Sequence, residues 1–294
     1  MKTDGVYNVK VVEIKARYGK TITIYFIGDI HYNSPGFARE KWEYDRARMI
    51  KESRTEDVYF ILGGDIFESF STTERKSFIG GDYHESNRRR WEDEYSREIK
   101  SFVKENQFLV GRTLSVYGGN HFFSFSDGTT SDQVLARELG APYIGVCGYT
   151  VLVLKMNNTH SHEVKIFLHH GKSSGKRSGS MFNALEDAAS YFSDAQIIIM
   201  GHNHQMGVVP LPSIVCSSIG GRYKTKEVHR IVGRSGSYLK AYEEGRPSYA
   251  VDSMMRPSTL GSLPVKITPT RWCGWENKKR YDNRWVEIES IVRA

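Results

Sequence analysis

The chain has 294 residues, of which 39% are hydrophobic and 26% are charged, as in an ordinary soluble globular protein. It contains no stretch near the roughly 18 apolar residues of a membrane span and no apolar signal-peptide core at its start. Three scattered cysteines, Cys147, Cys216 and Cys273, exclude a C-x-x-C zinc or disulfide framework and predict a cytoplasmic protein with reduced thiols. The net charge of +7 favours an anionic partner or substrate.

Apolar runs alternate with amphipathic segments along the chain, which predicts an α/β fold. Strands are expected at 9–15, 21–27, 58–62, 114–117, 143–146, 150–156, 164–168 and 197–200. Helices are expected at 37–53, 87–105, 132–139 and 181–192. Further short β segments are expected at 206–210, 214–217, 237–242, 265–268 and 285–291. No internal repeat or long linker interrupts the pattern, so we expect one domain over 1–294, with 219–294 as a β-rich basic C-terminal extension.

Side chains that commonly bind metals follow five of the expected strands. They are Asp29, His31, Asp65, Asn120, His170, His202 and His204. Taken singly, Asp29 is explained by a cap or turn and Asp65 by an Asx turn. Because α/β sheets carry ligand sites beyond the carboxyl ends of their strands, the recurrence at five ends instead predicts convergence at one rim. Oxygen and imidazole ligands without thiolates suit hard or borderline divalent ions.

His169 and His170 leave an ambiguity, since either residue type could bind a metal. Alternation along a strand places the two side chains on opposite faces, so only one can enter the site. His202 and His204, separated by one residue, can point the same way.

The ordered motifs D-x-H, G-D-x-x-E, G-N-H, H-G and G-H-x-H, within about residues 20–218, resemble those of the calcineurin-like metallophosphoesterases. That superfamily includes Ser/Thr protein phosphatases, Mre11/SbcD-like nucleases and nucleotide phosphodiesterases. The resemblance implies a four-layer αββα sandwich of two mixed sheets flanked by helices, with the metal site at the C-terminal rim of the strands. It also implies two divalent ions, Mn²⁺ with Fe or Zn as alternatives.

The resemblance assigns the ligands to two ions that share one carboxylate. One ion takes Asp29, His31, Asp65 and His204, and the other takes Asp65, Asn120, His170 and His202. Asp65 would then bridge the ions. The family pattern also favours His170 over His169, because it places its ligand directly before the glycine.

His121 adjoins Asn120 and is the candidate for proton transfer. The resemblance implies that a metal-bridging hydroxide attacks phosphorus in line while His121 protonates the leaving oxygen. A cationic site lowers the pKa of an unpartnered imidazole, so a carboxylate partner is needed, and Glu68 is the candidate unless it is a solvated loop residue. Phe122 and Ser69 depart from the family pattern, and Ser69 stands where protein phosphatases carry a phosphate-binding arginine.

Three basic segments are candidates for substrate contact. Residues 171–179 follow His170 directly, but they are not a P-loop because Ile166 stands where the first glycine belongs. Residues 220–246 interleave cations with tyrosines, as in a single-strand nucleic-acid groove, although a solvated basic hairpin explains them equally well. The cations are Arg222, Lys224, Lys226, His229, Arg230, Arg234 and Lys240, and the tyrosines are Tyr223, Tyr238 and Tyr242. Residues 88–90 are balanced by acids and predict a solvated helix face.

Together these patterns predict a dinuclear metal-dependent phosphodiesterase that acts on nucleic acid or on nucleotides. The alternatives are a small-molecule cyclic-nucleotide phosphodiesterase, a broad phosphomonoesterase and a non-catalytic metal-binding scaffold. Retention of every ligand type together with His121 argues against the scaffold. The sequence does not indicate the oligomeric state.

Overall fold

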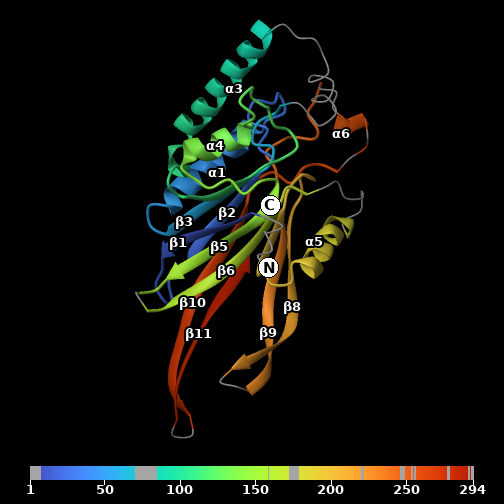
Figure 1. Ribbon diagram of the computed structural model, residues 1–294. Coiled ribbons are helices and arrows are strands. Elements are labelled where there is room, and N and C mark those ends of the chain that lie inside the picture. The colour runs from blue at the N-terminus through green and yellow to red at the C-terminus, as the bar shows by residue number, and fades with distance from the viewer. Residues whose placement is uncertain are drawn as a thin grey trace, which may run out of the picture.

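Two β-sheets pack face to face between helices in the computed structural model of the protein (Figure 1). The structure describes residues 8–69, 85–157, 159–171, 179–219, 222–245, 249–252, 254, 256–276, 279–290 and 292. Most of the basic segment at 171–179 therefore lies outside the described residues. Among the described residues, no helix is both long and apolar enough to cross a membrane.

The first sheet has the order β11-β10-β2-β3-β4. Its strands are β2 (Ile22–Gly28), β3 (Asp57–Gly63), β4 (Thr113–Tyr117), β10 (Leu263–Glu276) and β11 (Lys279–Ser290). β2, β3 and β4 run parallel, whereas β10 runs antiparallel to both β2 and β11. Every residue of β2 is buried, because both faces of this central strand are covered.

The second sheet has the order β1-β5-β6-β7-β9-β8. Its strands are β1 (Asn8–Lys15), β5 (Cys147–Lys155), β6 (Ser161–His169), β7 (Ile197–Met200), β8 (Met206–Ile219) and β9 (Arg222–Ser235). β6, β7 and β9 are parallel, and the sheet is mixed because β5 and β8 run against their neighbours β6 and β9.

Helices cover the outer faces of both sheets. They are α1 (Arg39–Glu52), α3 (Glu85–Glu105), α4 (Ser131–Leu139) and α5 (Ser180–Tyr191), with a 3₁₀ turn η1 (Gln107–Leu109) and the short α6 (Tyr249–Asp252). α4 shows how local sequence sets an element, because Thr130 and Gln133 form a capping box and Gly140 ends the helix at φ 67°.

Three apolar clusters separate the layers. Ile24 of β2 and Leu152 of β5 belong to the core between the sheets. Phe60 of β3 packs with Trp42 of α1, in the cluster that also takes α3 and α4, while α5 forms a third cluster on the second sheet. The predicted αββα sandwich of two mixed sheets is confirmed.

Several expected elements differ from the structure. Residues 143–146 and 237–242 are not strands, because Tyr143, Ser237 and Leu239 form only isolated bridges. The segments at 206–210 and 214–217 belong to one continuous strand, β8, which pairs with β9 along its whole length. The strands expected at 9–15 and 21–27, which are β1 and β2, enter different sheets.

Candidate metal centre

All seven candidate ligands lie in loops just beyond the C-terminal ends of five strands. β2, β3 and β4 of the first sheet and β6 and β7 of the second supply them. The loops meet directly: Asp29 N–H donates to the carbonyl of Gly64 at 3.0 Å, and His202 N–H donates to Asp29 Oδ2 at 2.9 Å. The two sheets are therefore joined at this rim by hydrogen bonds between the loops that carry the candidate ligands.

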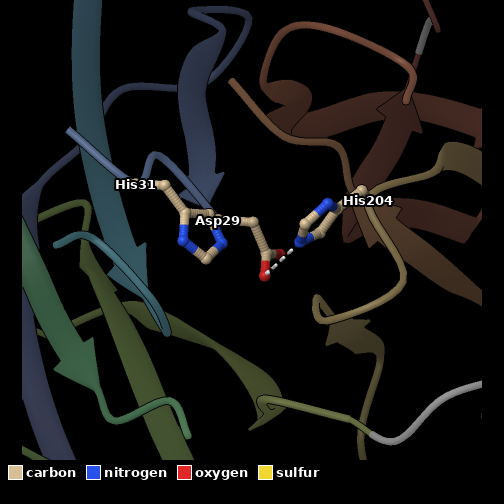
Figure 2. A group of neighbouring side chains, drawn as sticks. All are labelled: Asp29, His31 and His204. Carbon is tan, nitrogen blue, oxygen red and sulfur yellow. Dashed lines mark ion pairs between the residues drawn. The ribbon is translucent and has the colours of Figure 1, made fainter. Parts of the chain in front are cut away.

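The first group consists of Asp29, His31 and His204, whose ligand atoms lie within 4.8 Å of one another. Figure 2 shows the Asp29 carboxylate between the two imidazole rings, with Oδ1 3.7 Å from His204 Nε2. Asp29 and His31 are buried, and Asp29 Oδ1 and His31 Nε2 have no hydrogen-bond partner among the described residues. Buried polar atoms normally have partners, so these two donor atoms fit a cation.

The second group consists of Asp65, His170 and His202. His170 Nε2 lies 3.1 Å from Asp65 Oδ2, 2.7 Å from Asn120 Oδ1 and 3.1 Å from His202 Nδ1. Carboxylate, amide and imidazole donors thus face a common point. His169 instead accepts the N–H of Gly171 through Nδ1 at 2.6 Å, so His170 is the residue that faces the group.

Asp65 also contacts the backbone beside the candidate acid. Its Oδ1 accepts the N–H of His121 at 2.8 Å, while its Oδ2 faces His170. Asp65 belongs to the second group alone in the present geometry, so the bridging role stays a prediction.

Backbone strain is concentrated in these ligands. Six non-glycine residues in the described part of the chain have positive φ. They are Asp29, His31, Asp65, His202, His204 and Met254. Five of the six are candidate ligands, and such conformations cost energy that packing elsewhere must offset.

Glycines allow the loops to approach this closely. A Cβ on Gly64 would lie 2.0 Å from His170 Nδ1, and one on Gly119 would lie 2.0 Å from Asp65 Oδ1. A Cβ on Gly201 would lie 2.6 Å from Asp29 Oδ2. Glycine is therefore required at these loop positions by the space that the ligands occupy.

The electrostatics suit cation binding. Burial raises the pKa of Asp29 to about 6, whereas the nearby His170 outweighs burial and lowers the pKa of Asp65. Burial and neighbouring imidazoles lower the pKa of His202 to about 4 and of His204 to about 3. Neutral imidazole is the form that binds metals, and this nitrogen and oxygen donor set without thiolates fits hard or borderline divalent ions.

Glu68 lies between two histidines. Its Oε1 is 2.9 Å from His121 Nδ1, and its Oε2 is 2.5 Å from His31 Nδ1. Burial lowers the pKa of His121, but the Glu68 hydrogen bond and nearby carboxylates outweigh it and raise that pKa to about 9. The pKa of Glu68 falls to about 2, because both histidines outweigh its burial. The sequence suggested the contact with His121 but not the one with His31.

Other supporting residues gave no motif in the sequence. Asp132 Oδ2 accepts the N–H of Gly119 at 3.1 Å. The Ser237 hydroxyl and the Tyr238 N–H donate to the carbonyl of Asp29 at 2.8 and 2.9 Å. These groups hydrogen-bond to the backbone of loops that carry candidate ligands.

The basic segment at 220–246 does not form the expected substrate surface as a whole. Arg234 is wholly buried and donates to the carbonyls of Gly201 and Met181, and Tyr238 is buried as well. Arg230 donates to the carbonyls of Ala189 and Ser193 beside α5. These side chains support the fold. The Arg222 end of β9 lies 13 residues from the Ser235 end, which is roughly 40 Å from the rim at the rise of a β-strand.

Arg88, Arg89 and Arg90 on α3 are exposed, and Arg88 pairs with Glu92 at 3.4 Å, in keeping with the solvated face expected there.

Comparisons with known proteins give the same family as the motifs. The family model for calcineurin-like phosphoesterases matches residues 22–206, more than half of the chain. No curated protein sequence matches. Among solved structures, a mutant Vps29 from Entamoeba histolytica shares 14% identity at TM-score 0.36, covering 90% of this chain and 99% of its own.

The calcineurin-like phosphoesterase YfkN from Bacillus subtilis shares 12% identity at TM-score 0.36, covering 92% of this chain and 91% of its own. GAP50 of Plasmodium shares 10% at TM-score 0.40, covering 93% and 90%. The family match confirms the resemblance seen in the motifs: the chain belongs to the calcineurin-like phosphoesterases, a family of metal-dependent hydrolases.

Proposed function

We propose that this phosphoesterase is a dinuclear phosphodiesterase that hydrolyses the diester bonds of nucleic acid or nucleotides. The observation that carries the proposal is the pair of adjacent donor groups, Asp29 with His31 and His204, and Asp65 with His170 and His202. The Glu68–His121 pair adjoins both groups. Glu68 contacts His31 of the first group, and the His121 N–H donates to Asp65 of the second.

The two groups would each hold one divalent ion, with Asn120 completing the second and Asp65 proposed to bridge the two ions. Mn²⁺ is the proposed native ion, with Fe or Zn as alternatives that the same donors accept. Bound ions would neutralise the phosphate oxygens and activate the attacking water. The chain supplies the orientation, because His31 is fixed by Glu68 and the amide of Asn120 by its contact with His170.

His121 would deliver the proton to the leaving oxygen. Its Nδ1 is held by Glu68 Oε1 and by the carbonyl of Ser69 at 3.2 Å, which leaves Nε2 as the nitrogen that can donate to substrate. The pKa of about 9 keeps the ring protonated near neutral pH in the absence of ions, and bound cations would lower that pKa toward the range of a general acid.

A diester is favoured over a phosphoprotein monoester by the residue that follows Glu68. Ser69 is buried and supplies no cation for a dianionic phosphate. The net charge of +7 fits a polyanionic substrate. The unpaired cysteines fit a reducing compartment, so we place the enzyme in the cytoplasm.

The first test replaces Asp65 with asparagine. Asp65→Asn should abolish hydrolysis of bis(p-nitrophenyl) phosphate and reduce the content of Mn²⁺ at both sites, because the proposed bridging carboxylate would serve both ions. Glu138→Gln, on the exposed surface of α4, is the matched carboxylate control and should change neither quantity.

Metal content near that of the wild type, with activity retained, would remove Asp65 from the centre. A substrate panel with Mn²⁺ then compares diesters, monoesters, cyclic nucleotides and oligonucleotides. Preference for cyclic nucleotides or monoesters would replace the nucleic-acid proposal, and no turnover of any ester would leave the scaffold alternative.

A further inference from the structure

The loops that carry Asp29 and His204 are joined by residues from a later part of the chain. Residues 236–239 follow β9 directly, and residues 257–261 lead up to β10. Both stretches lie beyond residue 206, where the match to the family model ends. We call residues 236–239 the linking segment. Its contacts reach the backbone of two candidate ligands of the first group.

Ser237 of the linking segment holds the backbone of Asp29. Its hydroxyl donates to the carbonyl of Asp29 at 2.8 Å, and the N–H of Tyr238 donates to the same oxygen at 2.9 Å. On its other side, the N–H of Asp29 donates to the carbonyl of Gly64 at 3.0 Å. Asp29 has a φ of 47°, which is costly for a residue with a side chain, so these hydrogen bonds on both sides stabilise a strained conformation.

The backbone of the same serine is hydrogen-bonded to the segment that holds His204. Ser237 N–H donates to the carbonyl of Thr259 at 3.2 Å, and the carbonyl of Ser237 accepts the N–H of Gly261 at 2.8 Å. Thr259 N–H in turn donates to the carbonyl of His204 at 2.8 Å. His204 also has a positive φ, of 54°. Three hydrogen bonds in series therefore join the backbone of Asp29 to that of His204 through Ser237.

The linking segment is itself fixed against α1. Tyr238 is wholly buried, and its ring meets the ring of Trp42 edge-on with the centroids 5.0 Å apart. Its hydroxyl donates to Asp45 Oδ2 at 3.0 Å. Ser237 is wholly buried as well. A hydroxyl on a segment packed in this way has a defined position, so the Asp29 carbonyl that it binds is held at a defined place.

We propose that Ser237 is a positioning residue that sets the spacing between Asp29 and His204, two candidate ligands of the first group. The inference rests on the proposed function for its metal ion. Asp29 Oδ1 and His204 Nε2 lie 3.7 Å apart and approach each other from different loops (Figure 2). Metal–ligand distances tolerate deviations of about 0.2 Å, so a change in the separation of the two loops alters the affinity for an ion. Contacts that orient ligands commonly contribute about 10–100-fold to metal affinity.

The first measurement is the Mn²⁺ affinity of the full chain by calorimetric titration. Ser237→Ala should weaken one of the two binding events by about tenfold, because the Tyr238 N–H still reaches the Asp29 carbonyl. Ser115→Ala is the matched control, since Ser115 is wholly buried and its hydroxyl accepts from Thr150 of the other sheet. The control should lower the melting temperature and leave both affinities unchanged.

Ser237→Cys separates the hydrogen bond from the packing. A thiol keeps nearly the same volume but is a weak donor, so this variant should lose about as much affinity as the alanine variant. Wild-type affinity in the cysteine variant would show that the alanine variant suffers from an unfilled space, and the proposal would be wrong. The cysteine variant also decides the matter if the alanine variant loses the circular dichroism of the wild type.

A double-mutant cycle tests whether Ser237 acts through His204. Ser237→Ala should have no further effect on Mn²⁺ affinity in a His204→Ala background, because the ligand whose spacing it sets is gone. The tenfold effect should persist in a His170→Ala background, since His170 belongs to the second group. Equal effects in the two backgrounds would assign Ser237 to general support of the fold and overturn the proposal.

Hydrogen exchange in metal-free protein distinguishes failure of this inference from failure of the proposed function. Exchange of the Thr259 amide should accelerate in Ser237→Ala and not in Ser115→Ala, because that N–H ends the hydrogen-bonded path at His204. Acceleration confined to Leu239, whose N–H donates to Ser237 Oγ, would be a local effect and would overturn the proposal. If the wild type binds no Mn²⁺ while the Thr259 amide responds, the spacing role is retained and the proposed function is removed.

Discussion

Gly119 is the position where one added methyl group should test the metal centre most directly. Its Cβ would lie 2.0 Å from Asp65 Oδ1, 2.4 Å from Asp65 N and 2.8 Å from the Cα of Gly64. Two of these atoms belong to the backbone, so no side-chain rotation relieves the clash. The φ of Gly119 is not in the left-handed region, so alanine itself adds no conformational strain.

The size of the effect follows from these distances. Ordinary van der Waals contact begins near 3.4 Å, so Asp65 Oδ1 and the new Cβ must separate by more than about 1 Å. Asp65 Oδ1 also holds the N–H of His121, so the displacement reaches both the candidate ligand and the candidate acid. Misplacement of about 1 Å costs on the order of 10²-fold in rate, and ligand distances tolerate only about 0.2 Å.

We therefore expect Gly119→Ala to lower kcat/KM for bis(p-nitrophenyl) phosphate by about 10²-fold or more and to weaken Mn²⁺ binding in calorimetric titration. Overpacking should also lower the free energy of unfolding by about 1–3 kcal/mol. Gly179→Ala, before α5, is the control because a Cβ there meets nothing within 4 Å. Near wild-type activity and metal affinity in Gly119→Ala would refute the placement of Asp65 in the centre.

The remaining predictions concern the Glu68–His121 dyad. His121→Ala should slow hydrolysis of esters with poor leaving groups by roughly 10²–10⁴-fold but spare nitrophenyl esters and metal content; equal losses on both would make His121 structural. In metal-free protein the pKa of His121, raised to about 9, means that pairing with Glu68 stabilises the fold fully between about pH 4.5 and 6.5 and loses this effect as pH rises through 9. The melting-temperature deficit of Glu68→Gln should thus shrink between pH 6 and 10, and a constant deficit would contradict the pairing.

Much of the fold could be predicted because buried parallel strands appear in the sequence as unbroken apolar runs. β2, β3 and β7 were located to within one residue for that reason. The strands predicted at 143–146 and 237–242 were wrong because a short apolar run does not reveal its hydrogen-bond partners. Tyr238 N–H, for example, donates to the carbonyl of Asp29, more than 200 residues away in the chain. β9 was not predicted as a strand because its many cations indicated a basic surface segment, whereas the structure shows it as a regular partner of β8.

The candidate site was largely visible because each ligand type follows its strand directly. The sequence could not show the supporting contacts, which join residues that only the fold brings together. Arg234 is the instructive case, since in the sequence it is one more cation of a basic segment. In the structure it is buried and binds the carbonyl of Gly201, next to His202. A charged residue type in the sequence does not show whether its side chain is exposed or what it binds. For this reason the basic segment at 220–246 could not be assigned as a substrate surface from its charges.

The candidate metal centre is energetically costly to fold without ions. Asp29 and Asp65 are both buried, and the proximity of each disfavours ionisation of the other. Five candidate ligands are held in the left-handed region, and three glycines leave room for them. Strain, buried charge and donor atoms without partners all oppose folding stability, so packing alone gives no reason to collect them at one rim. Divalent cations would satisfy these donors and offset the repulsion between the two carboxylates, so bound ions would make this arrangement favourable.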